Sequence, residues 1–256
     1  MKNTLRQIAV VISVVLTLVV NTLANTLPLN GQNTGQISDQ FKVYFVPAGY
    51  VFSIWGLIYV GLIAYTIFQA LPSQRENPRL QATGWWIVLG GIANSIWIFL
   101  WHYNQFPLTV VAMLVLLVSL LVVYVKLGVN RSKISTAEKL AVHLPFSIYL
   151  GWITVATIAN ISDVLYFIKW NGFGLTPELW MSIILGAVVL IAALMNFLRR
   201  DIAYAAVLLW ALYGITVRKA GTPVVTPTWI AFGLVALTLV IALVIRKPVQ
   251  SELAKP

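Results

Sequence analysis

The stretch PLTVVAMLVLLVSLLVVYVKL, residues 107–127, decides the fold class of this chain. No charged residue interrupts it from Pro107 to Val125. A helix rises only about 1.5 Å per residue, so it needs roughly 20 mostly apolar residues to cross the hydrocarbon core of a bilayer. The stretch therefore predicts a membrane-spanning helix, with its proline in the first turn, where a helix tolerates it.

Seven further apolar runs lie along the chain. The eight candidate spans are 8–27, 49–70, 84–103, 107–127, 143–166, 178–198, 202–217 and 227–245, of which the seventh is short. Hydrophobic residues make up 60% of the 256 residues and charged residues only 9%, whereas a soluble domain usually has about a quarter charged residues. The sequence therefore predicts an all-α, polytopic membrane bundle of about eight transmembrane helices and excludes a disordered chain.

The charges predict an orientation. The chain holds 17 Lys and Arg against 7 Asp and Glu. With eight spans, Lys42, Lys169, Arg218 and Lys219 fall on one side of the membrane, and the remaining thirteen cations fall on the side of both termini. Because cytoplasmic loops carry the excess of Lys and Arg, we expect both termini to be cytoplasmic, in a plasma (inner) membrane. No nucleic-acid partner is expected, because the cations form no basic stripe.

The first run allows two interpretations. Its apolar core, 8–20, is short and follows Lys2 and Arg6, which is also the shape of a secretory signal peptide, with Ala24 as a poor cleavage site. A retained helix and a cleaved signal leave the other seven spans oriented the same way. The charge count therefore does not separate the two interpretations.

Residues suited to catalysis or metal binding are scarce. There is no Cys, and the two histidines, His102 and His143, lie in different runs without the spacing of paired ligands, so no metal site is expected. No charged residue lies near the middle of a run, which disfavours proton relays and ion-coupled pumping. Asp163 lies near the end of the fifth run and is expected at the membrane interface. We predict no catalytic residue.

Three runs carry aromatic side chains on one helical face, since the members recur at spacings of three or four residues or their sums. They are Phe52, Trp55 and Tyr59 in the second run, Asn94, Trp97 and Trp101 in the third, and Tyr149, Trp152 and Asn160 in the fifth. Unpaired amides in hydrocarbon are costly, so Asn94 and Asn160 are predicted to face the bundle and to be hydrogen-bonded. Helix packing accounts for the stripes in one interpretation, and an aromatic cavity for a flat or bulky apolar ligand in the other.

Three motifs resemble a known family. Residues 45–59, FVPAGYVFSIWGLIY, are followed by ANSIW at 93–97 and by LPF at 144–146, which leads through Trp152 to Asn160. In this order they resemble the tryptophan-rich sensory protein family, which includes the translocator protein. The chain departs from the family pattern where a double proline becomes Pro47-Ala48 and a tryptophan becomes Tyr50.

The resemblance implies a five-helix translocator-like core at 1–170, and it leaves three additional transmembrane helices at 171–256. It also implies a pocket inside the bundle, covered by the loop around Pro47. The residues expected to bind ligand are Tyr50, Phe52, Trp55, Tyr59, Asn94, Trp97, Trp101, Tyr149, Trp152 and Asn160. The family binds porphyrins and sterols and can form homodimers, so a tetrapyrrole is a possible ligand here, although no resident cofactor is expected.

Three functions remain in competition. The first is binding of a hydrophobic ligand, a planar tetrapyrrole or a sterol-like molecule, in a sensory or transport-accessory role. The second is a permease or facilitator for a small apolar solute. The third is an enzyme that degrades a bound tetrapyrrole through Trp55 and Trp152, although no acid–base pair in the sequence supports it. The expected partners are membrane lipid, the small-molecule ligand and, as the resemblance implies, a second copy of the chain.

Overall fold

The computed structural model describes residues 2–245, and that part of the chain is helical without any strand. The eight long helices are α1 (Lys2–Thr26), α3 (Ile54–Ala70), α4 (Pro78–His102), α5 (Phe106–Leu127), α7 (Leu144–Phe167), α8 (Pro177–Arg199), α9 (Ile202–Arg218) and α10 (Val225–Val244). Seven of them are long and apolar enough to cross a membrane, and α9 is the shorter apolar helix predicted as the seventh run. The all-α polytopic bundle is therefore confirmed.

Short elements fill the connections between the long helices. They are η1 (Leu29–Gly31), α2 (Thr34–Ser38), η2 (Gly49–Ser53), η3 (Pro72–Gln74), α6 (Thr136–Glu138), the π-helical turn η4 (Lys139–His143) and η5 (Gly172–Gly174). The α2 helix begins with a capping box, in which Asn33 accepts a hydrogen bond from the backbone of Gln36 and the Gln36 side chain accepts one from the backbone of Asn33. This reciprocal cap lets a five-residue helix form in the long connection between α1 and α3.

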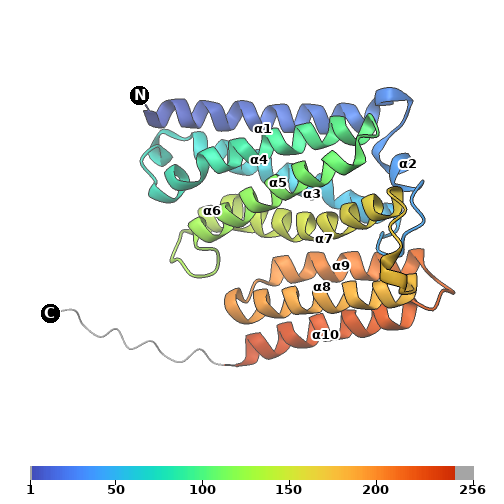
Figure 1. Ribbon diagram of the computed structural model, residues 1–256. Helices are drawn as coiled ribbons and strands as arrows, with labels where there is room; N and C mark the ends of the chain where they lie inside the picture. Colours follow the sequence, from blue (N-terminus) through green and yellow to red (C-terminus); the bar gives the residue numbers. More distant parts are fainter. Residues whose placement is uncertain (1, 246–256) are drawn as a thin grey trace.

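The long helices lie side by side in layers (Figure 1). The α1 helix packs against α3 and α4, α4 packs against α5, and α5 packs against α7. Close approach of α1 to α4 depends on glycines of α4, since a Cβ at Gly84 would collide with Arg6 and one at Gly91 with Ser13. The α9 helix packs against α7, and α8 and α10 pack against α9 and against each other. The last three helices thus join the bundle through α9.

A buried carboxylate fastens this junction. Asp201, the N-cap of α9, is 2% exposed and accepts hydrogen bonds from the hydroxyls of Tyr124 on α5, at 2.7 Å, and Ser147 on α7, at 2.6 Å. It also accepts the backbone N–H of Tyr204 at 3.1 Å. Three donors satisfy a group that would otherwise be costly to bury. The position of α9 against α5 and α7 is therefore fixed by a polar contact as well as by packing.

The α1 helix begins and α10 ends at the same end of the bundle, at the left of Figure 1. The connections that carry α2 and η5 lie at the opposite end. This arrangement agrees with an even number of crossings. The predicted cytoplasmic placement of both chain ends stays a prediction.

Candidate functional site

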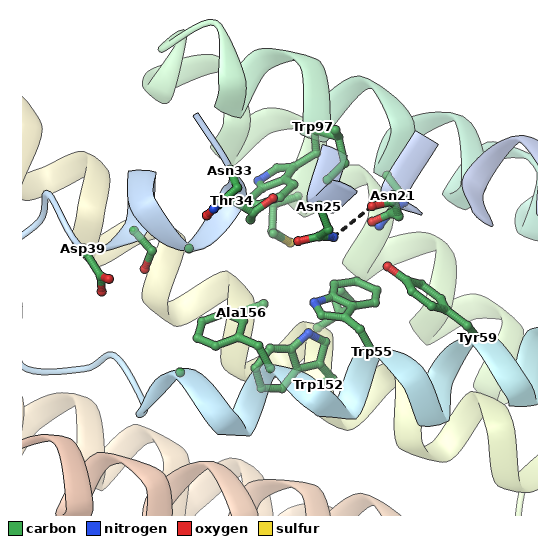
Figure 2. A pocket seen from close by; sticks show the side chains of 18 of the residues that line it. Asn21, Asn25, Asn33, Thr34, Asp39, Trp55, Tyr59, Trp97, Trp152 and Ala156 are labelled. Carbon is green, nitrogen blue, oxygen red and sulfur yellow. Dashed lines mark hydrogen bonds between the residues drawn. The ribbon is translucent and has the colours of Figure 1, made fainter. Parts of the chain in front are cut away.

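A cavity of about 480 Å³ lies among α1, α3, α4 and α7, with α2 along one side (Figure 2). Its lining residues come from elements far apart in the sequence. They are Asn21, Asn25, Asn33, Thr34, Gly35, Ser38, Asp39, Gly49, Phe52, Trp55, Tyr59, Asn94, Trp97, Ile98, Met113, Trp152, Ile153, Ala156 and Arg218. We call this space the main cavity.

Aromatic rings form one wall of the main cavity. The indole of Trp55 stacks on Tyr59 with ring centres 5.6 Å apart and planes 30° apart. Trp152 stands edge-on to Phe52, at 5.5 Å, and to Trp55, at 6.3 Å. Figure 2 shows Trp55, Tyr59 and Trp152 on one side of the space, with Trp97 across from them. A flat apolar group placed between these rings could contact aromatic faces and edges from α3, α4 and α7.

Hydrogen bonds hold Trp97 in place. Its indole N–H donates to Asn160 Oδ1 at 3.1 Å, and Asn160 Nδ2 donates to Thr109 Oγ1 at 2.8 Å. On the same helix as Trp97, Asn94 Oδ1 accepts a hydrogen bond from Asn21 Nδ2 at 2.5 Å. Asn94 is 2% exposed and Asn160 is 3% exposed. The prediction that both amides face the bundle and are hydrogen-bonded is confirmed.

The opposite side of the main cavity has a polar wall, which was not predicted from the sequence. Asn21 and Asn25 of α1 line the main cavity, and each donates to the backbone carbonyl four residues earlier at 2.8 Å. Thr17 does the same at 2.9 Å. The spacing of these three residues is visible in the sequence and could have indicated a polar face on α1. The contribution of α2 had no such signal, because it depends on how the connection between α1 and α3 folds back over the bundle.

A basic side chain from α9 joins this connection to the last three helices. Arg218 donates to Asp39 Oδ1 at 2.7 Å and to the carbonyl of Pro47 at 3.4 Å. Nearby, the backbone N–H of Ala48 donates to the carbonyl of Gly214 at 3.0 Å. A Cβ at Gly214 would collide with Val51, so glycine is required for this approach. The loop around Pro47 thus rests on α9 while its flanking elements line the main cavity.

A family model described as "TSPO-like protein" matches residues 7–245. The chain belongs to the TSPO-like family. Together with its seven long apolar helices, this makes it an integral multi-pass membrane protein. The match runs beyond 8–170, where the sequence motifs lie, and continues through α8, α9 and α10. Comparison with curated proteins found no match, and comparison with solved structures found none either.

In this TSPO-like protein, six of the ten predicted ligand-binding residues line the main cavity: Phe52, Trp55, Tyr59, Asn94, Trp97 and Trp152. Trp101 and Asn160 line a small neighbouring cavity, and Tyr149 lines a narrow cleft deeper among α1, α3, α4, α5 and α7. Tyr50 was expected at the rim, but the η2 turn directs it to α9, where it is 43% exposed and stands edge-on to Trp210 at 5.3 Å. Tyr50 therefore lies outside the site.

The structure buries Asp163, which its expected place near the membrane interface did not indicate, and its depth in the membrane stays a prediction. Asp163 is 3% exposed and lies inside the bundle, in the lining of the small cavity. The cause is helical periodicity, because Asp163 continues the stripe of Trp152, Ala156 and Asn160 on the inner face of α7. The connection before α3 covers this end of α7, since Thr34, Ser38 and Pro47 line the same cavity.

A second cavity of about 410 Å³ lies on the far side of α7, against the start of α8. Tyr44, Tyr166, Trp170 and Trp180 are among its lining residues, and none of the ten predicted residues is. The Tyr44 hydroxyl donates to Glu178 Oε1 at 2.8 Å, and this hydrogen bond raises the pKa of Tyr44. The main cavity and this second cavity are both lined by aromatic side chains, and of the two only the main cavity is lined by residues predicted to bind ligand.

Proposed function

We propose that this protein binds a hydrophobic, planar ligand, tetrapyrrole or sterol-like, in the main cavity, and that it serves in a sensory or transport-accessory role. One observation carries the proposal. Five aromatic side chains from η2, α3, α4 and α7 line a single space of about 480 Å³, and ligand sites usually measure about 300–1,000 Å³.

The aromatic wall and the polar wall would make different contributions to ligand binding. Each ring that stacks on a planar ligand contributes about 0.5–1.5 kcal/mol beyond the burial of apolar area. The amides of Asn21, Asn25 and Asn94 supply hydrogen-bonding groups on the side of α1 and α4. The rings would thus supply affinity and the amides would set the orientation of the ligand. From the charge distribution we expect α2, and with it this end of the cavity, to lie on the outer side of the membrane.

The alternative function is a permease or facilitator for a small apolar solute. Among α1, α3, α4, α5 and α7 lies a cleft of about 20 Å³ that shares no lining residue with the main cavity. Phe146 and Tyr149 line that cleft, and they are 1% and 5% exposed. A solute would need these buried rings to move before it could cross. This constriction favours stable binding over permeation.

Tryptophan fluorescence of the purified protein in lipid nanodiscs would test the proposal, with protoporphyrin IX and a sterol as probes. We expect saturable quenching by at least one probe, weakened by Trp55→Leu. Trp85→Leu is the matched control, because Trp85 is 54% exposed and is not in the lining of the main cavity. Absence of saturable binding, combined with probe flux in proteoliposomes, would instead favour the permease.

A further inference from the structure

Asp163 is a buried acid on the inner face of α7. It is 3% exposed, its Oδ1 atom is buried without a hydrogen-bond partner, and no side-chain hydrogen bond of Asp163 is found within residues 2–245. Asp201 is equally buried but has three donors. An isolated carboxylate in a low-dielectric interior is costly unless something pairs with it. Asp201 therefore has hydrogen-bond partners in the protein, whereas Asp163 has none within residues 2–245.

The space beside Asp163 adjoins the main cavity. The small cavity that it lines measures about 60 Å³. Seven residues line both spaces: Thr34, Ser38, Phe52, Trp97, Met113, Trp152 and Ala156. A ligand that stacks on Trp97 and Trp152 therefore lies next to the small cavity that Asp163 lines. A substituent of that ligand, directed along the inner face of α7, can reach Asp163.

Two of the hydrogen-bonding side chains at this end of the cavity are already engaged, whereas the indole N–H of Trp152, which lines both cavities, is buried without a partner within residues 2–245. Arg218 donates to Asp39 and to the carbonyl of Pro47. The indole N–H of Trp101 donates to the carbonyl of Thr34 at 3.3 Å. Asp39 and Arg218 form an ion pair, whereas Asp163, the other acid lining these two adjacent cavities, is paired with no basic side chain within residues 2–245. A cation placed beside Asp163 would stabilise its ionised form.

We propose that Asp163 anchors a protonated amine carried by the aromatic ligand of the main cavity. The inference rests on the aromatic site of the proposed function and assigns to that site a further class of ligand, which is neither a tetrapyrrole nor a sterol: an amphipathic aromatic amine. The rings of the main cavity would hold its flat apolar part. The ammonium group would enter the small cavity and donate charge-assisted hydrogen bonds to the carboxylate, which are stronger than bonds between neutral groups.

A matched pair of probes separates the effect of the ligand's positive charge from the effect of its aromatic rings. Biphenylmethylamine and biphenylmethanol have the same two rings and differ only in the amine and the hydroxyl. Their affinities for the wild-type protein and for Asp163→Asn would be measured by calorimetry in identical nanodiscs. The ratio of the two affinities is compared between the two proteins, so unequal partitioning of the probes into lipid cancels.

We expect the wild type to favour the amine by about tenfold or more, as a charge-assisted bond implies. Asp163→Asn should abolish that preference and leave the affinity for the alcohol within about twofold. Asp163→Glu should retain a preference, because it keeps the carboxyl group. The thermal midpoint of Asp163→Asn, which removes an unpaired buried acid, should not fall.

The outcomes separate this inference from the proposed function. If both probes bind the wild type equally well, or if Asp163→Asn keeps the preference for the amine, the anchor is refuted while the aromatic site stands. Preference of the wild type for the alcohol would show that Asp163 is neutral and recognises an uncharged group, which also refutes the anchor. If neither probe binds while protoporphyrin IX or a sterol does, the anchor alone is refuted, and if none of these compounds binds, the proposed site fails as well.

Discussion

Replacing Trp55 by leucine tests the candidate site directly. Trp55 is half-buried, lines the main cavity and is supported from behind, with Tyr59 stacked on it at 5.6 Å and Tyr149 edge-on at 6.0 Å. Leucine removes an aromatic face that a planar ligand would contact, which costs about 0.5–1.5 kcal/mol of binding free energy. A further loss of roughly 40 Å² of apolar contact adds about 1 kcal/mol. The affinity should therefore fall about 10- to 70-fold.

The assay is the quenching titration in nanodiscs, repeated with Trp55→Phe and Trp85→Leu. Phenylalanine keeps a ring in place, so we expect it to lose no more than about threefold in affinity. The control variant Trp85→Leu should bind the probe with wild-type affinity. Thermal unfolding of each variant separates loss of binding from loss of fold, because Trp55→Leu also removes aromatic pairs within the protein.

Wild-type affinity in Trp55→Leu, with the fold intact, would contradict the reasoning. Tight binding that survives the double variant Trp55→Leu/Trp152→Leu would move the site elsewhere. The second cavity against α8, which is lined by Trp170 and Trp180, is then the place to test.

Three further predictions concern topology, packing and the connection before α3. Reporter fusions at Lys133 and Lys169 should read cytoplasmic and external respectively, as the charge distribution requires, and the reverse readings would refute the orientation. Gly214→Ala should destabilise the protein by about 1–3 kcal/mol because its Cβ would collide with Val51. Gly186→Ala on α8, where a Cβ would meet nothing within 4 Å, should leave the thermal midpoint unchanged or raised. Equal effects of the two substitutions would disprove the packing argument. Arg218→Gln removes a partly exposed ion pair worth about 0–1 kcal/mol, so the midpoint should hardly move while hydrogen exchange over 34–39 speeds up, and unchanged exchange would show that the ion pair does not restrain α2.

Several features of this protein could be predicted from the sequence because their causes are local. Long uncharged runs such as 107–125 cannot be solvated as loops and must cross a bilayer as helices, where every backbone group bonds within the segment. Helical periodicity placed Trp55, Trp97 and Trp152 on inward faces, and the cost of an unpaired amide in lipid predicted the buried bonds of Asn94 and Asn160. Each argument uses residues within a few turns of one another.

Only the tertiary structure decided which faces meet. The α1 helix brings Asn21 to Asn94 across 73 positions of sequence, and the fold of the connection before α3 sets α2 beside the cavity. The ion pair of Arg218 with Asp39 spans 179 positions, and no local pattern specifies it. Asp163 shows the same limit, because its sequence position near the end of a helix does not reveal that residues 34–47 cover it. Helix formation in a membrane is fixed by each segment's own length and polarity, whereas lateral packing depends on the shapes of surfaces that meet only after all the segments have assembled.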